Sequence, residues 1–152
     1  MAGSFGLSAY RALARRGEAR PPVFDGPRPE GELLWIHCAE AAAFIAVQDL
    51  AQRQISSRPG LSVLISLPTL PRESGPEGGV RPVGVVLTEI CTDHPASVTA
   101  FLNHWAPDCC VWTWGGLRPN LILEASARAC PLFLINADTA GFDGRRERWL
   151  PD

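Results

Sequence analysis

The chain has 152 residues and contains no lysine, so all fourteen of its basic residues are arginine. Coding bias explains this absence more simply than chemistry does, although arginine is always charged and forms bidentate ion pairs. The net charge is only −2. A near-neutral balance argues against non-specific binding of nucleic acid, because that affinity comes mainly from neutralising phosphates. We therefore expect no nucleic-acid partner.

Long apolar runs are also absent. No run reaches the roughly 18 residues that a spanning helix needs, and the N-terminus lacks the apolar core and cleavage site of a signal peptide. The five cysteines are odd in number and form no C-x-x-C pair, which fits neither a disulfide framework nor a zinc site. We expect a cytoplasmic protein with free thiols and no metal centre.

Motifs for the common nucleotides and nucleophiles are missing as well. The sequence has no G-x-G-x-x-G after its first predicted strand, no P-loop lysine and no G-x-S-x-G elbow. These absences exclude the standard dinucleotide and P-loop sites and the α/β-hydrolase mechanism. We expect no cofactor.

The sequence that is present divides into four parts. Residues 1–20 mix apolar side chains with four arginines, which is typical of a short interfacial helix, although a helix packed on its own domain or a frayed terminus would read the same way. Residues 21–32 are a Pro/Gly connector, residues 33–140 are the expected main domain, and residues 141–152 are a tail. The N-terminal helix could touch a membrane surface.

The main domain alternates apolar strands with amphipathic helices. The expected strands are 33–38, 61–67, 83–87, 109–114 and 131–136, and the expected helices are 40–54, 95–105 and 117–129. The stretch 70–82 is too rich in Gly and Pro for a helix, so it is expected to be a loop. This order predicts the α/β class, with a Rossmann-like, doubly wound, mainly parallel five-stranded sheet and helices on both faces.

Ligands of open α/β sheets bind beyond the carboxyl ends of the strands, near the switch in strand order. The polar residues expected at that edge include His37, Glu40 and Asp93. A lone histidine there is more often structural than a ligand. Glu40 could serve a helix dipole as readily as act as a general base. A small α/β enzyme that uses these three residues stays open.

Several of these segments, in order, resemble the N-terminal domain of the 3-deoxy-D-manno-octulosonic acid (Kdo) transferases, the GT-B glycosyltransferases of lipopolysaccharide synthesis. The resemblance lies in LLWIHCAEAAA (33–43), LPT (67–69), DHPASVTAFLNHWAPD (93–108), LRPNLILEASARACPLFLINA (117–137) and the Arg-rich N-terminus. It implies the acceptor-side lobe of an enzyme that transfers Kdo from CMP-Kdo to a lipid A precursor at the cytoplasmic face of the inner membrane. CMP-Kdo would bind mainly to a second lobe. The implied acceptor-binding residues are His37, Thr69, Asn120 and Asn136.

The resemblance weakens at the charged positions. The family's H-x-x-S-V-G-E ends in the general base, which is replaced here by Ala43, while Glu40 falls at the Ser. The family's E-T-E-L-W-P-N becomes residues 114–120 and loses both carboxylates. Glu40, one helical turn before Ala43, is the candidate catalytic residue. The chain alone is expected to be inactive, and the alternative is a non-catalytic relative that acts as a binding or interaction protein. An exposed cleft face could also pair two copies of the chain.

Overall fold

A computed structural model describes residues 5–70, 83–113 and 115–135 of the chain. Its centre is a five-stranded sheet in which every neighbouring pair of strands is parallel, in the order β3-β2-β1-β4-β5. The strands are β1 (Glu32–His37), β2 (Leu61–Leu67), β3 (Val85–Glu89), β4 (Cys109–Trp112) and β5 (Leu132–Leu134). The predicted α/β class and Rossmann-like parallel sheet are confirmed.

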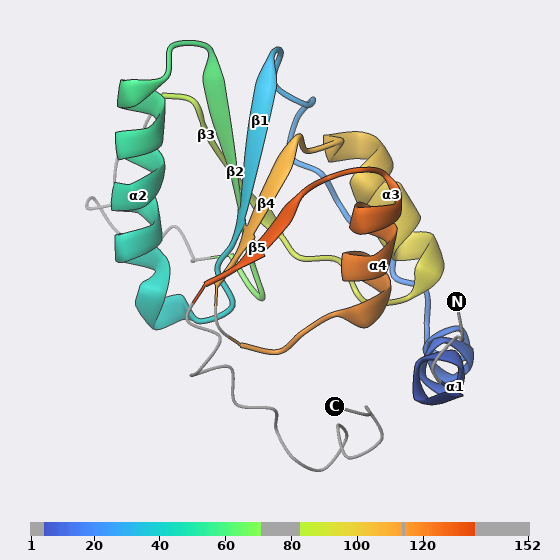
Figure 1. Ribbon diagram of the computed structural model, residues 1–152. Helices are drawn as coiled ribbons and strands as arrows, with labels where there is room; N and C mark the ends of the chain where they lie inside the picture. Colours follow the sequence, from blue (N-terminus) through green and yellow to red (C-terminus); the bar gives the residue numbers. More distant parts are fainter. Residues whose placement is uncertain (1–4, 71–82, 114, 136–152) are drawn as a thin grey trace.

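Helices cover both faces of this sheet, as Figure 1 shows. Helix α2 (Phe44–Ser57) lies on one face, and helices α3 (Pro95–Trp105) and α4 (Pro119–Ala127) lie together on the other. The apolar core is accordingly divided into two clusters, one under α2 and one under α3 and α4. Alternate residues of each strand enter alternate clusters, so Trp35 packs toward α3 while Ile36 packs toward α2.

The strand order fixes where a ligand would bind. From β1 the chain moves outward through β2 to β3, and then returns to the other side of β1 to form β4 and β5. The order therefore reverses between β1 and β4, which leaves their carboxyl ends side by side, with His37 opposite Trp112. This is the switch point at which open α/β sheets bind ligands.

Two element boundaries near the start of the domain differ from the prediction. The expected helix 40–54 is divided into a short 3-10 turn, η1 (Ala41–Ala43), followed by α2, which extends to Ser57. The expected strand 83–87 begins two residues later, because Gly84 has a left-handed φ of +88° and belongs to the preceding turn.

The C-terminal elements are shorter than predicted. Helix α4 does not begin at Leu117, because the residue before a proline is sterically kept out of helical geometry, and Arg118 accordingly has φ −117° and ψ 89°. Beyond the end of α4, Ala129 has a φ of +58°, which no helix continues through. The expected loop 70–82 from residue 71 onward, Trp114, Asn136 and the tail lie outside the described residues.

The N-terminal helix covers only part of residues 1–20, because α1 (Phe5–Ala14) is followed by a turn at Gly17. It lies at the carboxyl side of the sheet, near α3 and α4 (Figure 1). The Tyr10 hydroxyl donates to Asp93 Oδ2 at 2.7 Å. This contact attaches α1 to the edge that carries the switch point.

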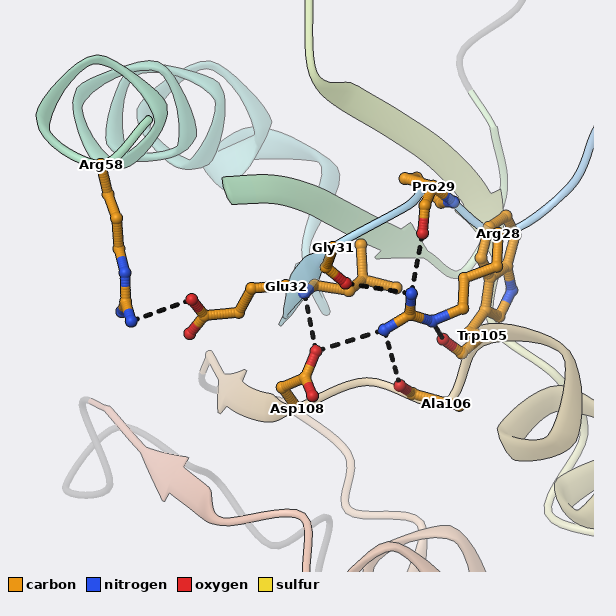
Figure 2. Close-up of polar contacts among 9 residues, drawn as sticks. Arg28, Pro29, Gly31, Glu32, Arg58, Trp105, Ala106 and Asp108 are labelled. Carbon is orange, nitrogen blue, oxygen red and sulfur yellow. Dashed lines mark hydrogen bonds and ion pairs between the residues drawn. The ribbon is translucent and has the colours of Figure 1, made fainter. Parts of the chain in front are cut away.

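The connector 21–32 is fastened along α3. Phe24 stacks on His104 with ring centroids 3.9 Å apart and an interplanar angle of 3°, and the Ser97 hydroxyl donates to Arg20 O at 2.7 Å. Figure 2 shows the contacts of the Arg28 guanidinium, which belongs to this connector. It pairs with Asp108 at 3.2 Å and also donates to the carbonyl oxygens of Pro29, Gly31, Trp105 and Ala106. The end of α3 is thereby joined to the start of β1.

Candidate functional site

His37 ends β1 at the switch point and is buried, with 2% of its surface exposed. Its Nδ1 lies 2.9 Å from Ser66 Oγ, and that same oxygen accepts a 2.8 Å hydrogen bond from Trp35 Nε1. Burial and, second, the positive charge of Arg118 lower the pKa of His37 from 6.5 to about 3, although a hydrogen bond with the backbone of Ser66 acts in the opposite direction. The imidazole is therefore neutral at pH 7.

The loops that follow β1 and β4 pass very close to each other beside His37. Thr113 Oγ1 donates to His37 O at 2.8 Å and accepts from Ala39 N at 3.1 Å. Gly115 has φ +120°, and a Cβ built there would overlap Ala39 Cβ. Only glycine fits this position, since an added methyl would clash and the backbone is in a region closed to other residues.

Asp93 organises the neighbouring part of the edge. Its carboxylate accepts from the backbone N–H groups of Asn120 and Leu121 at 3.0 Å each, besides the Tyr10 hydroxyl. Asn120 is buried, and its side-chain amide donates to Asp93 O at 2.8 Å. Because these N–H groups are orphan donors of the first turn of α4, Asp93 serves as the helix's cap from a distant part of the chain.

The predicted site residues thus fall into two groups. The Asn120 amide is held against the Asp93 backbone, whereas Glu40 and Thr69 are exposed, with no partner for either side chain in the part of the chain that the structure describes. Glu40 precedes η1 with an extended backbone and makes no side-chain capping bond. It therefore projects a free carboxylate at the edge where His37 ends.

Position 43 differs sharply from position 40. Ala43 is 7% exposed and packs in the apolar cluster under α2, with Ile36 and Val47 among its members. A carboxylate at this position would have to leave water without a polar partner in that cluster, which is costly. Of the two positions, only Glu40 now offers a base to solvent.

Arg118 was not among the residues that the sequence nominated. It lies directly before α4, half-buried, and no hydrogen bond or ion pair joins its side chain to another described residue. Its charge acts on both His37 and Cys91. The sequence shows Arg118 as a single cation in the Gly-rich segment between β4 and α4. Only the tertiary structure shows that its charge acts on His37.

An open groove of about 510 Å³ adjoins Arg118. One wall is the connector from Arg20 to Asp25, and the other consists of the ends of β2 and β3 and the segment that follows β3. Its polar lining includes Thr88, Glu89 and Thr92. The groove has room for a ligand larger than a single ion at the carboxyl edge.

The thiols add no reactive group to this edge. Burial raises the pKa of Cys91 to about 12 and that of Cys130 to about 11, and it also raises the pKa of Cys110. A thiol is a poor nucleophile and metal ligand when its thiolate is this disfavoured. Over residues 5–70, 83–113 and 115–135, no cluster of three or more His, Cys, Asp or Glu side chains could hold a metal ion. None of the helices described there has the length and apolarity to span a bilayer.

Comparison with known proteins gives consistent results. The model of the family described as 3-deoxy-D-manno-octulosonic-acid transferase (kdotransferase) matches residues 11–149. A probable mitochondrial 3-deoxy-D-manno-octulosonic acid transferase of Arabidopsis thaliana is 30% identical over 110 residues, covering 72% of this chain and 24% of the plant protein. The 3-deoxy-D-manno-octulosonic acid transferase of Bordetella pertussis is 26% identical over 155 residues, covering 97% of this chain and 34% of the bacterial protein.

No solved structure matches the chain significantly. The chain spans about a quarter to a third of the length of the two curated relatives. The family match nevertheless extends from the last turn of α1 over the whole sheet and the switch point. The chain therefore belongs to the family of the 3-deoxy-D-manno-octulosonic acid transferases.

Proposed function

We propose that this chain is the acceptor-side lobe of a GT-B glycosyltransferase that transfers Kdo from CMP-Kdo to a lipid A precursor. The observation that carries the proposal is the switch point of a family-matched sheet, at which Glu40 and Thr69 are exposed and at which Pro68, Leu70 and Arg118 line an open groove. CMP-Kdo would bind to a second lobe, so the chain alone would be inactive. No cofactor takes part in the proposed reaction.

In the proposed reaction the acceptor hydroxyl lies at the carboxyl edge of β1. Its oxygen forms a bond to the anomeric carbon of Kdo while the bond from that carbon to the phosphate oxygen of CMP breaks, so that CMP leaves with the bonding electron pair. The hydroxyl proton passes to the Glu40 carboxylate, which acts as general base. His37, Thr69, Asn120 and Asn136 are the proposed acceptor-binding residues; Asn120 would act through the position of α4, because its amide is already engaged.

The second candidate function is a binding or interaction protein without catalysis. It is favoured by the buried Ala43 at the position of the family's base and by the absence of carboxylates from residues 114–118. A partner in that case could be a second copy of the chain. The two candidates differ in whether the chain takes part in transfer, with Glu40 in place of the missing base.

The N-terminal helix supports a further part of the proposal, contact with the cytoplasmic face of the inner membrane. Leu13 of α1 is 65% exposed, and Arg11, Arg15 and Arg16 are exposed on the helix and just after it. An exposed apolar side chain flanked by arginines suits an anionic lipid surface. We accordingly propose four parts: the helix within 1–20, the connector 21–32, the acceptor-side domain 33–140 and the tail 141–152.

The experiment is a pair of assays on the 152-residue chain. With CMP-Kdo and lipid IVA we expect no transfer, and Kdo transfer by this chain alone would contradict the need for a second lobe. With lipid IVA in vesicles we expect binding that weakens in Thr69→Val, while Glu40→Gln binds as the native chain does. If lipid IVA does not bind at all, the acceptor-side assignment is wrong.

Two further measurements separate the remaining alternatives. In a two-lobed protein that carries this chain, loss of transfer in Glu40→Gln would support the catalytic candidate, whereas absence of transfer before the substitution would support the binding candidate. Sedimentation with anionic vesicles, with and without residues 1–20, tests the membrane contact. Equal binding by both forms would contradict it.

A further inference from the structure

We propose that the groove between the connector and the ends of β2 and β3 binds an organic anion, in which an oxyanion is attached to an apolar chain, and that Arg118 binds the charge of this ligand. The inference goes beyond the proposed function, which gives Arg118 no part in binding. It concerns the chemistry of the ligand, so it holds whether or not the chain supports transfer.

Arg118 is a cation without a counter-ion. Its side chain is half-buried, and no oxygen among the described residues accepts from it. A charged group that has lost part of its water and has no partner gains free energy when an opposite charge binds. Every other described arginine from residue 20 onward already forms an ion pair with a carboxylate, namely Arg20, Arg28, Arg53, Arg58 and Arg128.

The groove brings Arg118 together with a space of useful size. Arg118 lines the groove of about 510 Å³ beside Cys91 and Thr92. Burial raises the pKa of Cys91 to about 12, and the positive charge of Arg118 acts against this rise, which agrees with a guanidinium on the groove side. Ligand pockets typically have volumes of about 300–1,000 Å³. The groove therefore has room for an organic molecule around the charged group.

Much of the remaining lining is apolar. Pro22 and Val23 line the connector side of the groove, and Leu70, Leu87 and Ile90 line the sheet side. Val23 is 89% exposed, so its side chain is available to a ligand. An apolar chain bound between these two sides would remove both from water, which is favourable. The lining thus suits a ligand that is anionic at one end and apolar along the rest.

The other charges of the groove do not cancel this cation. Arg20, Asp25 and Glu89 also line it, but all three are exposed, and water and salt screen exposed charges strongly. Glu89 in addition accepts from Leu70 N at 3.2 Å. The segment 114–118 contains no acidic residue. The least screened charge of the groove is therefore positive.

Hydrogen bonds fix both sides of the groove before a ligand binds. On the connector side, the Ser97 hydroxyl donates to Arg20 O at 2.7 Å, and Thr92 Oγ1 donates to Ser97 Oγ at 3.0 Å. On the sheet side, Ile90 N donates to Leu67 O at 2.8 Å. A ligand that enters such a groove does not have to order the backbone around it, which lowers the cost of binding.

The test is calorimetric titration of the 152-residue chain with hexyl phosphate, hexanoate, inorganic phosphate and 1-hexanol at constant ionic strength. Hexyl phosphate should bind at least about tenfold more tightly than inorganic phosphate, because two buried methylenes would supply that factor. It should exceed hexanol by a similar factor, because hexanol carries no charge. Saturable binding of hexanoate alone would also support the proposal and would identify the oxyanion as a carboxylate. If either inorganic phosphate or hexanol binds as tightly as the better hexyl anion, the proposal is wrong.

Variants then locate the bound ligand. Arg118→Gln should weaken binding of the hexyl anion at least about tenfold, because it removes a charged donor, while Arg118→Lys should keep part of the affinity. The control Arg128→Gln removes an arginine that is paired with Glu124 and Asn103 and should leave binding unchanged. Val23→Ser, at an exposed position, should weaken binding of the hexyl anion and leave that of inorganic phosphate unchanged.

Two results with the variants would overturn the proposal. One is equal affinity of the native chain and Arg118→Gln for the hexyl anion. The other is an Arg118→Gln effect that Arg128→Gln reproduces. Urea unfolding of each variant shows whether it is folded, and the exposed Val23→Ser keeps the groove testable if Arg118→Gln does not fold, since an unchanged affinity in Val23→Ser would contradict binding in the groove. Lipid IVA binding tests the proposed function separately, because either ligand can bind without the other.

Discussion

The buried, neutral state of His37 makes a quantitative prediction about stability and pH. In the unfolded chain a histidine takes up a proton near its ordinary pKa of 6.5, whereas the folded state holds the pKa of His37 at about 3. Between these values the unfolded chain binds a proton that the folded chain does not. Stability is therefore fully present above pH 6.5 and is lost as the pH falls toward 3.

The size of the loss follows from the gap between the two pKa values. At pH 7.5 the unfolded histidine is almost entirely neutral, so His37 contributes almost nothing to the pH dependence. At pH 5, which lies about 1.5 units below the unfolded pKa of 6.5, proton uptake by the unfolded chain lowers the free energy of unfolding. At 1.36 kcal/mol per unit, this loss amounts to about 2 kcal/mol. Solvent screening is small, because the side chain is 2% exposed.

The assay is urea unfolding of the native chain and of His37→Gln at pH 7.5 and pH 5. The variant is expected to be less stable at both values, because Ser66 and Trp112 lose a fitted partner. The informative quantity is the change between the two pH values, which should be about 2 kcal/mol larger for the native chain. Other titrating groups cancel in this difference. An equal pH dependence in both proteins would refute the neutral, buried assignment.

Three other predictions concern the loops and thiols around the site. Asp93→Ala leaves two N–H groups in the first turn of α4 without an acceptor. It should lower the unfolding free energy by about 2–4 kcal/mol, which corresponds to roughly 5–15 °C in melting temperature. The control Asp49→Ala, at an exposed position, should lower it by under about 1 kcal/mol. Gly115→Ala places a methyl against the loop after β1 and should cost about 1–3 kcal/mol, whereas Gly116→Ala, with open space around it, should change stability little; equal effects would contradict the close approach of the loops. Among the five cysteines Cys109 alone is not buried, so mass spectrometry after brief maleimide labelling at pH 8 should find it modified first, and earlier modification of any buried thiol would contradict the packing.

Much of the fold could be predicted from the chain alone. The apolar run at 61–67 became β2 without a shift, and the helix predicted at 95–105 became α3 with the same bounds. These elements are fixed by local signals, continuous burial in one and a proline in the first turn of the other. The predicted boundaries were wrong where a residue with positive φ sets them. Gly84 makes β3 begin later than predicted, and helix α4 ends before Ala129.

The candidate site was predicted less completely. The sequence nominated His37 and Glu40 because one lies near the end of an apolar strand and the other just after it. The resemblance to the family's H-x-x-S-V-G-E motif implied that Ala43 replaces the general base. It contained no sign that position 43 is buried while position 40 is exposed. That difference depends on how η1 turns over the edge of the sheet, which is a property of packing.

The sequence by itself determined the alternation of strands and helices, the family, and the identity of the groups that stand at the strand ends. The tertiary structure alone decided which of those groups are free. Asp93 and Asn120 of α4 occupy each other across 27 residues of chain. Arg118 acts on His37 although three strand connections separate them along the chain. Hydrogen-bond partners and charges act through space, so their pairing is set only when the parallel sheet brings its carboxyl ends together.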